Sequence, residues 1–152
     1  MKIGFGCDHA AVEMKNTLME HLTEAGHECV DFGTDSSEHR VDYPEKALAV
    51  AEAIKAGEID KGVLCCGTGI GMCLAANKVP GIRASVCREP YSAQLTVQHN
   101  NANIITIGAR VIGPELAKMT VDAFFNAEFE GGRHANRVNM ITAIEEKYSK
   151  AD

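Results

Sequence analysis

Short apolar runs of the β type alternate with helical patterns from one end of this 152-residue chain to the other. The β-type runs cover residues 2–6, 28–32, 62–66, 83–87 and 103–107. Between them lie stretches whose apolar residues recur at three- and four-residue spacing, such as Met14, Leu18 and Leu22 in the first. This order of elements is typical of βαβ units, in which helices join parallel strands and cover the sheet.

The alternation predicts a fold of the α/β class. Because crossovers between parallel strands are right-handed, we expect a three-layer α/β/α sandwich with a Rossmann-like, five-stranded parallel sheet. A last helical pattern after Gly131-Gly132 predicts an extra C-terminal helix, and no linker or repeat divides residues 1–152, which are expected to form one domain. In such sheets ligands bind at the carboxyl ends of the strands, where the following loops converge.

The net charge and the cysteines indicate which partners and which cellular compartment to expect. A formal net charge of −6 argues against a nucleic-acid partner, which would need a basic face. The six cysteines are interpreted as free thiols, because Cys65 and Cys66 are adjacent and others lie in predicted strands. Free thiols indicate a reducing cytoplasm, and we find no apolar segment long enough to cross a membrane.

Residues 61–71 carry the strongest chemical signal, because a predicted strand ends there in Cys66 and continues as Gly67-Thr68-Gly69-Ile70-Gly71. The spacing fits two alternatives: a tight strand-to-helix turn, or a nest of backbone N–H groups that binds an anion. In the nest, each N–H aimed at a developing oxyanion can contribute roughly 3 to 4 kcal/mol. The same groups would favour the thiolate form of Cys66, a candidate nucleophile or base, whereas Cys65 points to the other face of the strand.

Three known phosphate-binding loops do not match this segment. A Walker loop would need a lysine after the glycines, and the dinucleotide fingerprint would need a third glycine where His9 stands. A cysteine phosphatase loop would need an arginine six residues after its cysteine, where this chain has Met72. Nucleotide binding and phosphatase chemistry are therefore disfavoured.

Polar residues elsewhere form three further candidates. Asp8 and His9 follow the first strand at the predicted ligand edge, where an acid and an imidazole can handle hydroxyl protons and phosphate; a helix cap is the alternative for Asp8. Arg133 and Arg137, four apart on one helical face, are either a solvated face or a phosphate clamp. His99 precedes the fifth strand, at the amino end of the sheet, so it is either structural or serves a neighbouring subunit's site.

The remaining histidines show no spacing typical of metal ligands. They are His21, His27, His39 and His134. We therefore predict neither a metal nor a cofactor.

As a set, these motifs resemble the type B ribose-5-phosphate isomerase family, which also contains galactose-6-phosphate and allose-6-phosphate isomerases. The resemblance covers essentially the full length. Its motifs are Gly6-Cys7-Asp8-His9, Asp42-Tyr43-Pro44, Cys66-Gly67-Thr68-Gly69-Ile70-Gly71, Ala75-Ala76-Asn77-Lys78, Glu89-Pro90-Tyr91-Ser92-Ala93, Gln98-His99-Asn100, and Glu130-Gly131-Gly132-Arg133-His134 with Arg137. Some relatives have serine at position 66 and use a glutamate at position 72, so Cys66 with Met72 indicates the branch with a cysteine base.

The resemblance implies an aldose–ketose isomerase that works without a metal, through a cis-enediolate. Cys66 would move a proton between C2 and C1, Thr68 and His99 would open the sugar ring, and Asp8 would handle the hydroxyls. The positions implied for substrate binding are His9, Arg110, Arg133 and Arg137 around the phosphate, with Tyr43, Gly67, Gly69, Ile70, Gly71 and Asn100 in the rest of the pocket. The resemblance also implies a homodimer with shared active sites, which gives His99 a place in the partner's site. Pairing of two such dimers into a tetramer is left open by the sequence.

The expected reaction is the interconversion of D-ribose 5-phosphate and D-ribulose 5-phosphate in the pentose phosphate pathway. We expect residues 67–71 to hold the enediolate and the arginines to hold the phosphate. A six-carbon substrate, allose 6-phosphate or galactose 6-phosphate, is an alternative that depends on pocket length around Tyr43, Ile70 and Arg110. A non-enzymatic sugar-phosphate-binding subunit is a second alternative, disfavoured because Cys66, Thr68 and the other motif residues are all present.

Overall fold

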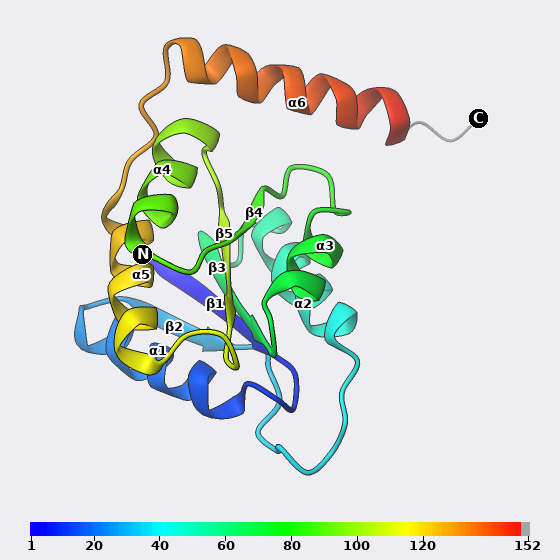
Figure 1. The fold of residues 1–152 in the computed structure, drawn as a ribbon. Helices are drawn as coiled ribbons and strands as arrows, with labels where there is room; N and C mark the ends of the chain where they lie inside the picture. The colour runs from blue at the N-terminus through cyan, green and yellow to red at the C-terminus, as the bar shows by residue number, and fades with distance from the viewer. Residues whose placement is uncertain (150–152) are drawn as a thin grey trace.

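The computed structural model describes residues 1–149 and contains a five-stranded sheet flanked by helices (Figure 1). Neighbouring strands all pair in parallel, in the order β2-β1-β3-β5-β4. The strands are β1 (Lys2–Cys7), β2 (Glu28–Asp31), β3 (Lys61–Cys66), β4 (Ala84–Val86) and β5 (Ile104–Gly108). The predicted α/β class and parallel sheet are confirmed, and every predicted strand end lies within one residue of the observed end.

Helices connect the strands and follow the last one. They are α1 (Val12–Glu24), α2 (Tyr43–Lys55), α3 (Ile70–Ala76), α4 (Pro90–Asn100), α5 (Pro114–Asn126) and α6 (Arg133–Ser149). Proline lies at the start of α2, α4 and α5, where the missing N–H breaks no helical hydrogen bond. Gly26 and Gly57 have positive φ just after α1 and α2, a conformation that ends a helix.

Hydrophobic side chains fill both faces of the sheet. On one face, α1, α4 and α5 pack against strand residues that include Phe5 and Ile105. On the other face, α2 and α3 pack against Leu64 and its neighbours. Cys65 belongs to the first cluster and Cys66 to the second, because successive strand residues point to opposite faces. The predicted sandwich and the opposite orientation of the two cysteines are both confirmed.

Helix α6 is the predicted C-terminal helix. It lies beside α4, beyond the amino end of the sheet (Figure 1), and extends to the loop before β4, where the N–H of Gly81 donates to Glu145 Oε2 at 3.0 Å. Within residues 1–149, none of the helices combines the length and the apolar composition needed to cross a membrane. All five strands share one sheet, and the assignment of residues 1–152 to one domain stays a prediction.

Candidate active site

Cys66 ends β3 at the carboxyl edge of the sheet and is 5% exposed. Its Sγ accepts a hydrogen bond from the backbone N–H of Gly69, at 3.1 Å. Gly69 has φ of 78°, and a Cβ at this position would lie 3.1 to 3.3 Å from the backbone of Ile107 and Gly108. Position 69 therefore favours glycine for two reasons: the positive φ, and the lack of room for a Cβ. Its geometry aims an N–H at the sulfur, and such a donor is complementary to a thiolate.

The glycine loop uses part of its hydrogen-bonding capacity on itself. The N–H of Ile70 donates to Thr68 Oγ1 at 3.2 Å, and the N–H of Gly69 is taken by the sulfur of Cys66. The loop is thus both a tight turn and a set of donors, so the two alternatives of the sequence overlap. The next N–H groups, at Gly71 and Met72 in the first turn of α3, have no partner within the helix and are the ones left for an oxyanion.

Two glycines of the loop allow other side chains to approach. A Cβ at Gly71 would lie 2.7 Å from the ring of Tyr43, and a Cβ at Gly67 would lie 3.3 Å from Nη1 of Arg110. The N–H of Arg110 also donates to the carbonyl of Gly67, at 3.0 Å. Tyr43, the first residue of α2, is 42% exposed, and Arg110 is exposed. The structure therefore places a phenol and a guanidinium on either side of the loop.

Asp8 and His9 follow β1 and lie at the same edge of the sheet as Cys66, because β1 pairs in parallel with β3. The carboxylate of Asp8 is buried and accepts the N–H of Ala10 at 3.0 Å, while the N-cap position of α1 is Ala11, so the cap alternative is wrong. His9 Nδ1 accepts the N–H of Val41 at 3.3 Å. Since a backbone N–H can only donate, Nδ1 is unprotonated and the proton lies on Nε2, which can donate to an anion.

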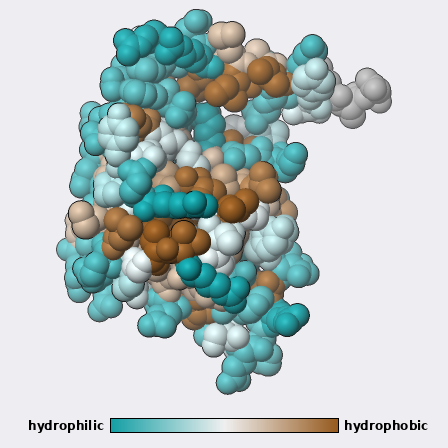
Figure 2. All heavy atoms as spheres, viewed as in Figure 1, coloured by the Kyte–Doolittle hydropathy of each residue, from teal (hydrophilic) through white to brown (hydrophobic). Residues whose placement is uncertain are grey.

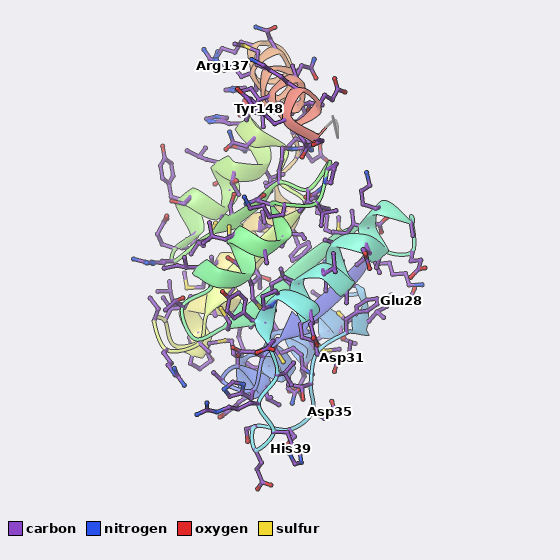
Figure 3. All side chains as sticks on the ribbon, turned by 90° about the vertical axis from the view of Figure 1, so that its right-hand side faces the viewer. Glu28, Asp31, Asp35, His39, Arg137 and Tyr148 are labelled. Carbon is purple, nitrogen blue, oxygen red and sulfur yellow. The ribbon has the colours of Figure 1, made fainter. Side chains whose placement is uncertain are left out.

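Four predicted site residues lie at the other end of the molecule. His99 and Asn100 end α4, and Arg133 and Arg137 lie in the first turns of α6, beyond the amino end of the sheet. Figure 3 shows Arg137 at one end of the molecule and His39, in the loop after β2, at the opposite end. His99 lies at the amino end of the sheet, as predicted from its position just before β5. A single chain therefore does not bring the two arginines to Cys66.

His99 belongs to a cluster that the sequence did not predict. Its ring stacks on His134, with centroids 4.1 Å apart and planes 8° from parallel, and its Nε2 lies 3.7 Å from Glu130 Oε1. His134 is buried, and burial together with the charges of His99 and Arg133 lowers its pKa. The sequence signal that could have predicted this cluster is the pair Gly131-Gly132, which marks a turn before α6. In the structure both glycines have positive φ and turn the chain from Glu130 into α6.

The same cluster brings together three side chains of the types that bind metals. The ligand atoms of His99, Glu130 and His134 all lie within 4.8 Å of one another. However, the lone pair of an imidazole nitrogen lies in the plane of its ring, so two stacked, nearly parallel rings direct their lone pairs along separate planes. Arg133 adds a positive charge beside them. The arrangement suits a stacked imidazole pair next to a carboxylate better than a shared cation, and the predicted absence of a metal stays a prediction.

Comparison with known proteins places this geometry in a family. The family model described as Ribose/Galactose Isomerase matches residues 3–141. The chain belongs to this family. Ribose-5-phosphate isomerase B of Escherichia coli (strain K12) is 57% identical over 146 residues, which cover 96% of this chain and 97% of that protein. D-erythrulose-4-phosphate isomerase of Pectobacterium atrosepticum is 48% identical over 141 residues, 93% of each.

Solved structures agree with this membership of the ribose/galactose isomerase family. Ribose-5-phosphate isomerase B of Clostridium thermocellum superposes with a TM-score of 0.96 at 52% identity, over 98% of this chain and 100% of that one. The resemblance and the enzyme class predicted from the sequence are confirmed: the chain is an isomerase. The roles of the individual residues within this family's reaction stay predictions.

Proposed function

We propose that the chain interconverts D-ribose 5-phosphate and D-ribulose 5-phosphate, with Cys66 as the base. The observation that carries the proposal is the hydrogen bond from the Gly69 N–H to the Cys66 sulfur, at 3.1 Å. The Cys66 thiol that receives this hydrogen bond is nearly buried. It lies at the same edge of the sheet as Asp8, Tyr43 and Arg110. Relatives named ribose-5-phosphate isomerase B support the choice of substrate. The pentose phosphate pathway is the expected setting.

The reaction begins with opening of the furanose, in which Thr68 and His99 move a proton from the O1 hydroxyl to the ring oxygen. The Cys66 thiolate then takes the proton from C2, the C–H electron pair forms the C1–C2 double bond, and the carbonyl electrons pass to O1. Asp8 moves the hydroxyl proton from O2 to O1. Finally the Cys66 thiol returns its proton to C1, which leaves a carbonyl at C2 and restores the thiolate.

The enediolate is the species that needs stabilisation, because a carbon acid beside a carbonyl is weak. N–H groups at the start of α3 are fixed in place before the reaction, so they can bind the developing charge without a cost of reorganisation. Arg110 and the Nε2 donor of His9 are the cationic and hydrogen-bonding groups available on this side for the phosphate. Binding and proton transfer thus use different groups.

The test of the mechanism is Cys66→Ala with Cys65→Ala as its matched control. Loss of a positioned proton-transfer group lowers turnover by about 100-fold or more, so Cys66→Ala should lose ketose formation while circular dichroism stays unchanged. Cys65→Ala removes a fully buried thiol from the opposite face and should keep kcat. Near-normal turnover in Cys66→Ala would falsify the mechanism.

We also propose that the active unit is a homodimer in which α6 and the end of α4 complete the partner's site. The distance of His99, Arg133 and Arg137 from Cys66 in one chain supports this. Helix α6 also exposes apolar side chains, and hydrophobic residues are visible along it in Figure 2. The exposed large side chains of α6 include Met140, Ile141, Ile144 and Tyr148, which are 50 to 77% exposed. A second copy of the chain would cover them.

Mixing inactive variants tests the sharing of sites. Heterodimers of His99→Ala and Cys66→Ala subunits contain one intact site if His99 serves the partner, so activity should return to a fraction of the wild-type value. Absence of recovery in confirmed heterodimers would assign His99 to its own subunit or outside the chemistry. Sedimentation equilibrium distinguishes a dimer from a tetramer.

Substrate length is tested with a panel of aldose phosphates. The 48% identity to a D-erythrulose-4-phosphate isomerase favours including four-carbon sugars beside ribose 5-phosphate, allose 6-phosphate and galactose 6-phosphate. Ribose 5-phosphate should give the highest kcat/KM. A cytoplasmic location is part of the proposal, supported by six cysteines that are all unpaired.

A further inference from the structure

Lys15 lies on α1 with none of its surface exposed to solvent. It shares the buried side of the helix with Met14 and Leu18, which pack into the core. Burial of an ammonium group is strongly unfavourable unless the charge is paired and hydrogen-bonded. The groups that surround its Nζ therefore determine what Lys15 stabilises.

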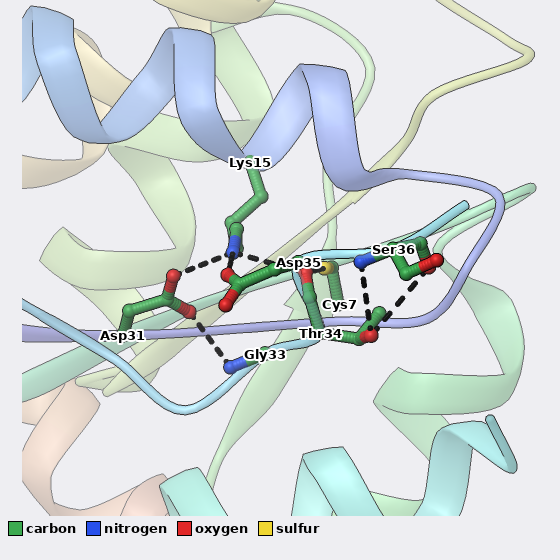
Figure 4. Close-up of polar contacts among 7 residues, drawn as sticks. All are labelled: Cys7, Lys15, Asp31, Gly33, Thr34, Asp35 and Ser36. Carbon is green, nitrogen blue, oxygen red and sulfur yellow. Dashed lines mark hydrogen bonds and ion pairs between the residues drawn. The ribbon is translucent and has the colours of Figure 1, made fainter. Parts of the chain in front are cut away.

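The partners of Lys15 come from one segment (Figure 4). Nζ lies 2.6 Å from Asp31 Oδ2 and donates to the carbonyl of Thr34 at 3.2 Å. A second carboxylate, of the exposed Asp35, lies 3.8 Å away. All three residues belong to the end of β2 or to the β2–α2 loop, which is formed by residues 32–42. Asp31 thus pairs the buried charge from the end of β2, and the loop supplies the further partners, Thr34 and Asp35.

The loop is also packed against Lys15 itself. The N–H of Gly33 donates to Asp31 Oδ1 at 2.8 Å. A Cβ at Gly33 would lie 2.9 Å from both Cys7 Sγ and Lys15 Cδ, so the loop backbone rests directly on these side chains. The Cys7 thiol donates to the same Thr34 carbonyl, at 3.6 Å. The first residues of the loop are therefore held against α1 and β1.

The far end of the loop reaches the candidate active site. The N–H of Val41 donates to His9 Nδ1 at 3.3 Å, and Tyr43 begins α2 with its ring against Gly71. The loop contains neither helix nor strand, so its course depends on its two anchors. One anchor is Lys15 and the other is His9.

We infer that Lys15 is a positioning residue of the active site, which holds the β2–α2 loop and through it Tyr43 and His9. The inference rests on the proposed isomerase function. If the loop moved away, Nζ would keep Asp31 at the end of β2 but would lose the Thr34 carbonyl and the Asp35 carboxylate. A buried ammonium with donors left unpartnered is unfavourable, so the charge favours the loop conformation that supplies both groups. A loop that visits several conformations lowers the fraction of molecules able to bind, and the apparent affinity falls by the same factor.

The test compares Lys15→Met with Leu18→Ala, a fully buried position in the next turn of the same helix. Lys15→Met places an apolar side chain in the same volume and should raise KM for ribose 5-phosphate by about tenfold, with kcat changed by less than about threefold. Leu18→Ala opens a cavity and lowers the melting temperature, but KM measured below the transition should be unchanged.

Amide hydrogen exchange gives a readout that does not depend on turnover. Exchange in residues 33–41 should become faster in Lys15→Met and not in Leu18→Ala. A folded Lys15→Met protein with unchanged KM, or with unchanged exchange in the loop, overturns the inference. If the wild-type chain turns over none of the sugar phosphates, the proposed function fails, and exchange alone then decides whether Lys15 anchors the loop.

Gly33→Ala provides the same test if Lys15→Met does not fold. The added methyl group meets Cys7 Sγ and Lys15 Cδ, so it displaces the loop while the ammonium remains. The variant should show a higher KM and faster exchange in residues 34–41. Wild-type values of both in Gly33→Ala overturn the inference.

Discussion

The imidazole rings of His99 and His134 lie face to face, with 4.1 Å between centroids and 8° between planes. Two protonated rings at this separation would repel each other. His134 is the ring whose charged form is opposed by burial, by His99 and by the guanidinium groups of Arg133 and Arg137, while Glu130 favours it. The pKa of His134 is therefore lowered, and Glu130 lies 3.7 Å from Nε2 of the neighbouring ring, His99.

The lowered pKa of His134 predicts a loss of stability in acid. The unfolded chain binds the proton near the ordinary histidine pKa of about 6.5, before the folded chain does. The free energy of unfolding should therefore fall as the pH drops from above 6.5 toward the lower pKa of the folded state. His134→Phe keeps an aromatic ring that cannot titrate, so urea unfolding should show a smaller decrease. His39→Gln, in an exposed loop, should keep the wild-type decrease, and equal decreases in all three proteins would contradict the prediction.

The six unpaired cysteines should differ in reactivity. Burial raises the pKa of Cys65, and burial together with the charge of Glu89 raises the pKa of Cys87 to about 12. Since the thiolate is the nucleophile, iodoacetamide at neutral pH should leave both unmodified in the folded protein. Cys66 should be alkylated with loss of activity, as measured by peptide mass spectrometry.

Cys29→Ala is the control for that experiment, because Cys29 is partly exposed and can react without reaching the site. The variant should lose activity at the wild-type rate when treated. Inactivation that disappears in Cys29→Ala would contradict the assignment to Cys66.

Gly71→Ala should weaken substrate binding by displacing Tyr43. The new methyl group would lie 2.7 Å from two atoms of the Tyr43 ring, which must then move. We expect KM to rise by about fivefold with a smaller change in kcat. Gly113→Ala is the matched control, because a Cβ there meets open space and its φ of −78° suits any residue. Equal KM values in the two variants would show that Tyr43 does not contact the substrate.

Arg110→Gln should raise KM by about tenfold or more, because a phosphate loses a charge-assisted hydrogen-bonding partner. Arg110→Lys restores the charge without the planar fork and should recover part of the loss. Lys118→Gln removes a partly exposed charge on α5 that pairs with Glu115 at 3.2 Å, and should leave KM unchanged. If all three variants have the wild-type KM, Arg110 does not hold the phosphate.

The sheet and the glycine loop could be predicted because their signals are local. Apolar runs identify each strand, and the glycines after Cys66 mark the turn that follows β3. The parallel topology then brings Asp8 and Arg110 to the edge where Cys66 ends its strand, although about 100 residues separate the first from the second. Periodicity and one topological rule are sufficient for that part of the site.

The other part depends on contacts that no local pattern encodes. A lysine on a helix is normally expected to be exposed, so the burial of Lys15 follows from Asp31 and from a loop without regular structure. The stacking of His99 on His134 requires α6 to turn back across α4. For the same reason, local periodicity does not predict that Arg137 lies at the opposite end of the chain's fold from Cys66.

The alternation of side chains along β3 has a consequence for folding fidelity. Cys65 and Cys66 are chemically identical thiols, and only their position in the strand decides which one meets the N–H of Gly69. A slip of β3 by one residue against β1 and β5 would exchange their faces, and the backbone hydrogen bonds of the ladder would be satisfied in either arrangement. Close packing opposes the slipped register, because it would bring Lys61 or Val63 to the place of Gly62, where a Cβ would lie 2.5 Å from Val50 Cγ1. The core of this enzyme therefore does more than stabilise it, because it selects which of two adjacent thiols receives the N–H of Gly69.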